Sequence, residues 1–101
     1  MAKLSTKNTS GTSFHGQTIY CSYNELVELI GEPQMVDNTG QDKVNFEWDC
    51  ETKDGTPFTI YDWKEYRVLD LDEEIEWHIG TLHSLSSITA SNELDALVRE
   101  L

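Results

Sequence analysis

The stretch VNFEWDCETKDGTPFTIYDW, residues 44–63, decides the fold. From Val44 to Glu51, apolar and polar side chains alternate, which is typical of a strand with one buried and one solvent-facing side. Asp54-Gly55 predicts a tight turn, and residues 58–63 supply the returning strand. Pro57 fits the start of that strand because it has no N–H to give to the ladder. The stretch therefore predicts an antiparallel β-hairpin.

Further strands are expected on both sides of the hairpin. Residues 66–71 (YRVLDL) and 75–79 (IEWHI) have strand-like composition and are separated by an acidic turn at residues 72–74. Residues 14–20 (FHGQTIY) alternate loosely and predict a first strand, which Gly16 weakens. Together these segments predict an antiparallel meander.

Two helices complete the expected fold. Ser22 and Glu25 form a capping-box pattern that begins a short helix, and Gly31 ends it. Leu94, Leu97, Val98 and Leu101 recur at helical spacing, so the chain closes on a helix that begins as early as Ser84. We predict an α+β fold: a small antiparallel sheet of about four to five strands, one short helix after the first strand, and a C-terminal helix.

The length of 101 residues corresponds to one domain. Residues 1–12 (MAKLSTKNTSGT) are polar and lack an apolar period, so we expect a mobile N-terminal arm before a single domain at residues 13–101. Cys21 and Cys50 lie far apart with no CxxC pair, and no apolar leader precedes them. These features predict reduced thiols in a cytoplasmic protein, and no apolar run reaches the ~20 residues that span a bilayer.

The chain is strongly acidic. It carries 19 acidic and 7 basic residues, for a net charge of −12. Such a charge disfavours direct binding to nucleic acid or to an anionic membrane and favours basic partners. The segment from Glu47 to Glu76 holds eleven of the acids, so the field is concentrated in the middle of the chain.

No motif predicts catalysis, a metal or a cofactor. His78 and His83 lie five residues apart, a spacing that places two ligands on one face of neither a helix nor a strand. Cys50 falls on the apolar side of its strand, where thiols are usually inert. The phosphate-binding, metalloprotease and hydrolase signatures are all lacking. We therefore interpret the protein as a non-enzyme that binds a partner.

Two surfaces are candidates for that binding. One is an acidic face, which resembles a row of phosphates and is alternatively a solvated sheet surface. Its residues are Glu47, Asp49, Glu51, Asp70, Asp72, Glu73, Glu74 and Glu76. The other gathers aromatic and basic side chains that suit a nucleotide and alternatively pack beneath a helix or at a homodimer seam. Its residues are Tyr61, Trp63, Lys64, Tyr66, Arg67, Trp77, His78 and His83.

The segments FTIYDWK (58–64) and EWHIG (76–80), with His83-Ser84 after them, resemble small uncharacterised proteins encoded by bacteriophages. The resemblance extends over roughly residues 20–100, including Gly31-Glu32-Pro33 and Phe46-Glu47-Trp48. It implies a viral protein acting inside an infected bacterium, with interference with host defence as its leading role.

Three functional hypotheses follow. The first is an anti-defence protein that sequesters a nucleotide-derived immune signal of the cyclic nucleotide class through the aromatic and basic residues. The second is an acidic nucleic-acid mimic that blocks a basic host defence protein, such as a nuclease, restriction or CRISPR effector. The third is a small structural or assembly protein of the virion.

Overall fold

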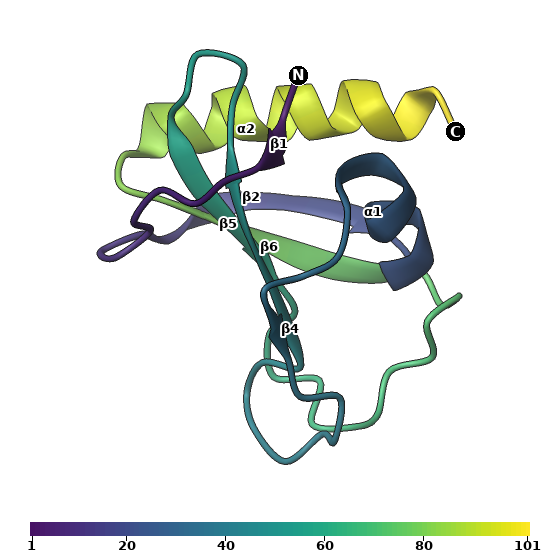
Figure 1. The fold of residues 1–101 in the computed structure, drawn as a ribbon. Helices are drawn as coiled ribbons and strands as arrows, with labels where there is room; N and C mark the ends of the chain where they lie inside the picture. The colour runs from purple at the N-terminus through teal and green to yellow at the C-terminus, as the bar shows by residue number, and fades with distance from the viewer.

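The computed structural model describes residues 1–101 as an α+β fold (Figure 1). The predicted hairpin is confirmed as β4 (Phe46–Glu51) and β5 (Pro57–Tyr61), and β2 (Ser13–Cys21) and β6 (Ile75–Thr81) form the other long strands. Two-residue strands, β1 (Lys3–Leu4) and β3 (Met35–Val36), are additional. The helices are α1 (Tyr23–Ile30) and α2 (Ser84–Arg99).

One antiparallel sheet contains all six strands, in the order β1-β4-β5-β6-β2, and β3 also pairs with β4. The sheet thus has more strands than the four to five expected. Both extra strands lie along β4, where each adds only two residue pairs. Segments this short carry too few residues for an alternating pattern, so periodicity does not reveal them.

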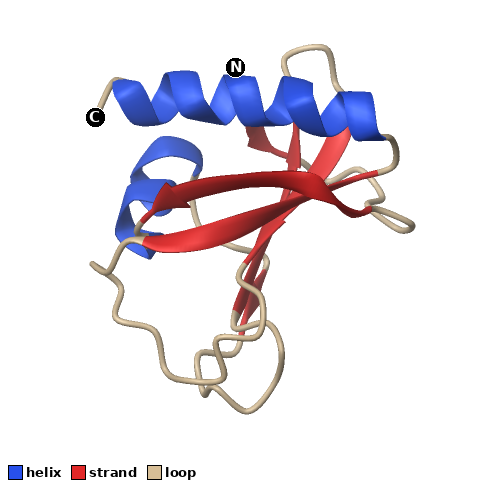
Figure 2. Ribbon diagram, turned by 180° about the vertical axis from the view of Figure 1, so that it is seen from behind, coloured by secondary structure: helices blue, strands red, loops and turns tan.

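The core lies between the inner face of the sheet and the two helices (Figure 2). Trp48 and Trp77 meet edge to face in its centre, with ring centroids 5.2 Å apart. Each indole N–H donates to a backbone carbonyl, Trp48 to Gly31 and Trp77 to Cys21, so the buried nitrogens are satisfied. Leu26 of α1 and Leu94 of α2 pack onto this centre.

Both predicted helices are confirmed. Ser22 caps α1 by accepting the Glu25 N–H, while the Glu25 carboxylate accepts the Ser22 N–H. The second helix begins at Ser84, the earliest expected start, with His83 as its N-cap. Neither helix combines the length and the apolar character needed to cross a membrane.

The predicted strand at residues 66–71 is wrong: this segment is a loop. Asn38 occupies the positions that a neighbouring strand would take, since its side chain accepts the Leu69 N–H and donates to the Leu69 carbonyl. Asn45 donates to the Arg67 carbonyl in the same way. The backbone of the segment is therefore held by side-chain amides rather than by a ladder.

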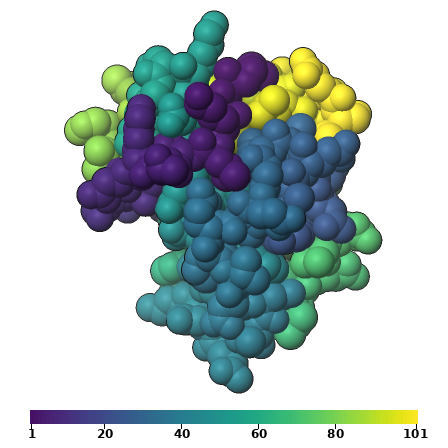
Figure 3. Space-filling view, in the orientation of Figure 1, coloured from purple at the N-terminus to yellow at the C-terminus, as the bar shows by residue number.

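Residues 1–12, expected as a mobile arm, are part of the fold. Lys3 and Leu4 pair with β4, Ala2 is buried, and the chain then passes from the β4 edge of the sheet to β2 at the opposite edge. Figure 3 shows this first segment, in purple, lying on the teal surface of the hairpin. The polar residues serve as hydrogen-bonding groups: the Ser5 N–H donates to the Asp49 carbonyl, and Lys7 reaches the Gly55 carbonyl.

Candidate ligand-binding site

The outer face of the sheet carries a row of polar and aromatic side chains. Glu47 of β4 pairs with Tyr61 of β5, Tyr61 pairs with His78 of β6, and His78 pairs with Thr18 of β2. Because opposed residues in adjacent strands project to the same side, the four side chains form one line across the sheet. The helices cover the other side.

Four rings gather along this line, and we call them the aromatic shelf: Phe14, Tyr61, Trp63 and His78. Phe14 stacks on His78 with centroids 4.1 Å apart and an interplanar angle of 20°. Trp63 lies 6.3 Å from His78 at 29°, and both stand edge-on to Tyr61. Phe14 is 43% exposed and Trp63 39%, so the shelf presents ring surface to solvent.

Gly80 makes room for the shelf. It pairs with Phe14 on one side and Thr59 on the other, and a Cβ at this position would lie 2.5 Å from the Thr59 Oγ1 and 3.4 Å from the Tyr61 ring. Gly16, at φ +97°, lies within the irregular stretch of β2 where its register against β6 shifts. A glycine suits that backbone because it has no Cβ.

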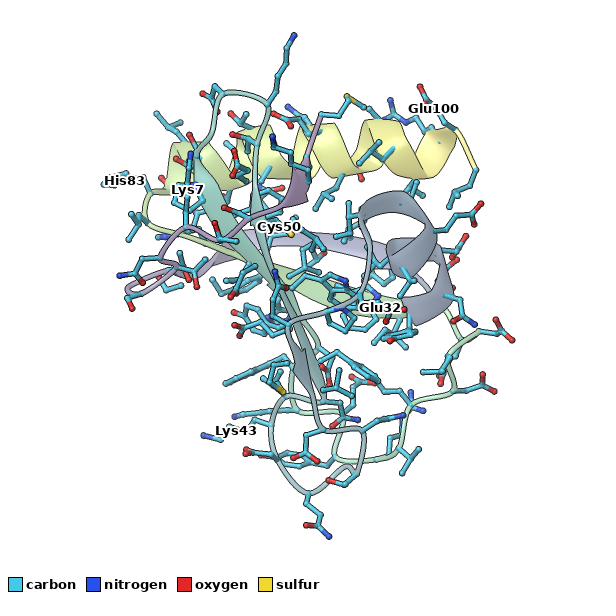
Figure 4. All side chains as sticks on the ribbon, in the orientation of Figure 1. Lys7, Glu32, Lys43, Cys50, His83 and Glu100 are labelled. Carbon is cyan, nitrogen blue, oxygen red and sulfur yellow. The ribbon has the colours of Figure 1, made fainter.

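Two lysines flank the exposed indole. The Lys64 Nζ lies 5.5 Å from the Trp63 ring centroid and the Lys43 Nζ 5.9 Å, both within cation–π range. The loops that carry them are joined, because the Lys64 N–H donates to the Lys43 carbonyl at 2.8 Å. Figure 4 shows Lys43 projecting from its loop on the side of β4 away from α1.

Burial and neighbouring charge alter the titration of the shelf. Desolvation lowers the pKa of His78, outweighing the opposite effect of Glu76, so its imidazole is neutral at pH 7. Desolvation and the nearby Glu47 raise the pKa of Tyr61, which keeps the phenol protonated. The positive charge beside the shelf therefore comes from the two lysines.

Glu47 lies at the acidic end of the row. Burial, followed by a hydrogen bond and electrostatic repulsion from Asp49, raises the pKa of Glu47 to about 7. The two carboxyl groups are near neighbours on alternate residues of β4. A carboxyl with this pKa exchanges its proton within the physiological range.

Of the predicted ligand residues, the structure brings together Tyr61, Trp63, Lys64 and His78. Trp77 does not belong with them: its side chain is fully buried in the core, on the opposite face of β6 from His78. Consecutive strand residues point to opposite sides, so Trp77 and His78 do not share a surface. A role for the Trp77 ring in contacting a ligand is thereby corrected to a role in the core.

The remaining predicted ligand residues lie off the shelf. Arg67 is occupied by ion pairs to Glu73 at 2.8 Å and to Glu65 at 3.2 Å. Tyr66 is exposed in the loop after β5, and its ring is in none of the aromatic contacts of the shelf. His83 is exposed at the start of α2.

Two residues of the site were not predicted, Phe14 and Lys43. Phe14 reaches the shelf because β2 pairs with β6, a pairing between distant segments that local patterning does not specify. Lys43 arrives through the backbone bond between its loop and Lys64. The sequence shows an aromatic residue near each end of β2, Phe14 and Tyr20, and this pattern does not single out Phe14.

The predicted acidic face is partly covered. Thr9 donates to the Asp49 carboxylate, and Lys7 lies 3.7 Å from the Glu51 carboxylate, whose side chain is only 17% exposed. The row on β4 therefore has the N-terminal segment against it. Three acids in the later part of the acidic face also have partners within the protein. Asp72 accepts from Asn24, Glu76 accepts from Tyr20, and Glu73 forms an ion pair with Arg67. Asp70 and Glu74 are exposed in the loop before β6.

A separate cavity of about 150 Å³ lies between the hairpin turn and the start of α2. Hydroxyl groups dominate its lining, and Asp54 supplies the one carboxylate, already bonded to Thr52 and Thr56. The cavity contains none of the predicted site residues. No group of three or more His, Cys, Asp or Glu side chains is arranged to hold a metal ion.

Comparison of the chain with protein-family models, with curated proteins and with solved structures finds no match. The case for function therefore rests on the residues of the site.

Proposed function

We propose that this protein is a non-enzymatic, phage-type anti-defence protein that binds and sequesters a nucleotide-derived immune signal, of the cyclic nucleotide class, in the cytoplasm of an infected bacterium. The observation that carries the proposal is the half-exposed Trp63 ring on the aromatic shelf with two lysine ammonium groups beside it. Aromatic and cationic groups in this combination suit a base and its phosphate.

The energetics favour a small ligand over a polymer. Stacking of a base on an aromatic side chain contributes about 1–3 kcal/mol. Lys43 and Lys64 add a local positive charge that pairs with one or two phosphates. A long nucleic acid would instead extend over the acidic surroundings, because the whole chain carries −12.

The acidic alternative has less support. A phosphate-like row needs exposed, ionised carboxylates, whereas Glu51 is mostly covered and Glu47 holds its proton up to about pH 7. The half of the acidic face on β4 is thus poorly suited to contact a basic partner.

Calorimetric titration of the protein with a panel of cyclic mono- and dinucleotides tests the proposal. We expect saturable binding without turnover of the ligand. Substitution Trp63→Ala should weaken the affinity about tenfold or more because the stacking surface is lost. The double substitution of Lys43 and Lys64 by Ala should weaken the affinity more at low salt than at high salt, because salt screens the attraction between lysine and phosphate.

Tyr66→Ala is the matched control, since it removes an exposed aromatic ring that lies off the shelf. It should leave the affinity unchanged. Flat titrations across the panel, or an equal loss with Tyr66→Ala and Trp63→Ala, would contradict the proposal.

A further inference from the structure

Glu47 differs from other acids of the outer surface in what its carboxyl group faces. Glu76 accepts the Tyr20 hydroxyl at 2.6 Å, and Glu73 accepts two guanidinium N–H groups of Arg67 at 2.8 Å. Glu47 instead faces another carboxylate, Asp49, and lies next to Tyr61 of the shelf. It is therefore an acceptor group at the edge of the stacking surface with no protein cation to satisfy it.

The chemistry of a carboxylate selects among the bases. Its two oxygens accept two parallel N–H donors, as they do from arginine. Guanine has two such donors side by side on its pairing edge, the ring N1–H and the exocyclic amino group. Adenine and cytosine each present one amino group beside a ring acceptor, which a carboxylate repels. Uracil presents one N–H between two carbonyls.

We propose that the outer-sheet site selects guanine nucleotides, with the guanine ring on the aromatic shelf, its N1–H and amino group donating to Glu47, and its phosphate at Lys43 and Lys64. This inference rests on the proposed function and names the base within it. The lysines lie beside Trp63 and Glu47 is paired with Tyr61, so the two polar contacts are offered beside different rings of the shelf.

A dependence on pH follows from the same geometry. Only the ionised carboxylate accepts both donors, and the pKa of Glu47 is raised to about 7 by burial and by Asp49. Guanine binding at pH 7 therefore releases a proton from the fraction of molecules in which Glu47 is protonated, and the affinity should rise from pH 6 to pH 8. Two other titratable groups of the shelf shift away from neutral pH, since the pKa of His78 is lowered and that of Tyr61 is raised. The charged groups that complete the surroundings are Asp49 beside Glu47 and the two lysines beside Trp63.

Calorimetry with GMP, IMP and AMP at pH 8 tests the selection. IMP retains the N1–H and lacks the amino group, so we expect affinities in the order GMP, IMP, AMP, with GMP at least about tenfold tighter than AMP. Glu47→Gln should weaken GMP binding about tenfold and should strengthen AMP binding or leave it no weaker, because the amide removes the charge that repels the adenine ring acceptor. Titrations at pH 7 in buffers of different ionisation enthalpy should detect proton release for GMP with the wild type and none with Glu47→Gln.

Glu74→Gln is the matched control, because it makes the same change of charge in the exposed loop. Equal affinities for GMP and AMP, or equal effects of Glu47→Gln and Glu74→Gln, would overturn the guanine assignment while leaving nucleotide binding intact. If the wild-type protein binds none of the nucleotides, the proposed function itself is refuted, so the two failures are distinguishable.

Discussion

Asp62 directly follows the last residue of β5, and its fully buried side chain lies beside the first residue of β4. Its oxygens accept the N–H groups of Asn45 and Phe46 at 2.8–3.0 Å. Burial raises the pKa of Asp62 even though these bonds oppose the shift. The residue therefore fixes the chain immediately before Trp63 and opposite the start of β4.

Substitution Asp62→Ala should destabilise the protein by about 2–3 kcal/mol, because two buried N–H groups lose a charged acceptor. Urea denaturation followed by circular dichroism measures the change. Asp95→Ala, in α2, serves as the control and should shift stability by less than about 0.5 kcal/mol. A similar small effect at both positions would mean that water replaces the Asp62 carboxylate.

Alternation along a strand explains which site residues the sequence reveals. Tyr61 and Trp63 share one side of the sheet because they are two residues apart on a segment in which Phe58 and Ile60 face the core. The same rule separates Trp77 from His78, and composition alone had grouped them. Closeness in sequence is thus a weaker indication that two rings share a surface than an even spacing along one strand.

At the level of elements, Gly80 connects the sheet to the shelf. Its hydrogen atoms face the Thr59 hydroxyl and the Tyr61 ring, where a methyl group does not fit without movement. The carbonyl carbon of Ser13, in the neighbouring strand β2, would lie 3.7 Å from the same added methyl carbon. The close packing of β6 against β5 and β2 at this point therefore requires a residue without a side chain.

Gly80→Ala should destabilise the protein by about 1–3 kcal/mol through overpacking. A double-mutant cycle with Thr59→Ala checks the cause, since removal of the hydroxyl relieves the closest contact. We expect a coupling of at least about 0.5 kcal/mol between the two substitutions. Simple additivity would show that the cost arises elsewhere.

The elements differ in how well local sequence specifies them. The β4–β5 hairpin has alternation and an Asp-Gly turn, and α1 has a capping box, so each is encoded within a short window. Residues 66–71 have strand-like composition, yet the side chain of Asn38 takes up the backbone groups of Leu69. An amide 31 positions away is beyond the reach of periodicity.

At the scale of the whole molecule, the N-terminal segment joins the two edges of the sheet. It adds β1 to β4, buries Ala2, and packs Leu4 on the core. Composition predicted mobility because the segment is polar, but its polar groups find partners on β4 and the hairpin turn. The order of this segment depends on tertiary contacts, and these cannot be read from its composition.

Deletion of residues 2–7 should lower the free energy of unfolding by about 3 kcal/mol, since the burial of Leu4 and the pairing of β1 are lost. Urea denaturation gives this value. The deletion also removes Lys3 and Lys7 and uncovers the Glu51 carboxylate, so the protein should be retained more strongly on an anion-exchange resin. Leu4→Ala is the comparison that retains Lys7 over Glu51; unchanged stability in both variants would contradict a structural role for the segment.

The pairing of β2 with β6 also bears on synthesis of the protein. Trp77 donates to a carbonyl 56 positions earlier, and α2, which completes the core, lies at the C-terminal end of the chain. On the ribosome, the hairpin is complete long before β2 has a neighbour. Pairings this distant in sequence slow folding and leave apolar strands exposed meanwhile. Chains that terminate before residue 75 should therefore aggregate or be degraded rather than persist as a smaller folded domain.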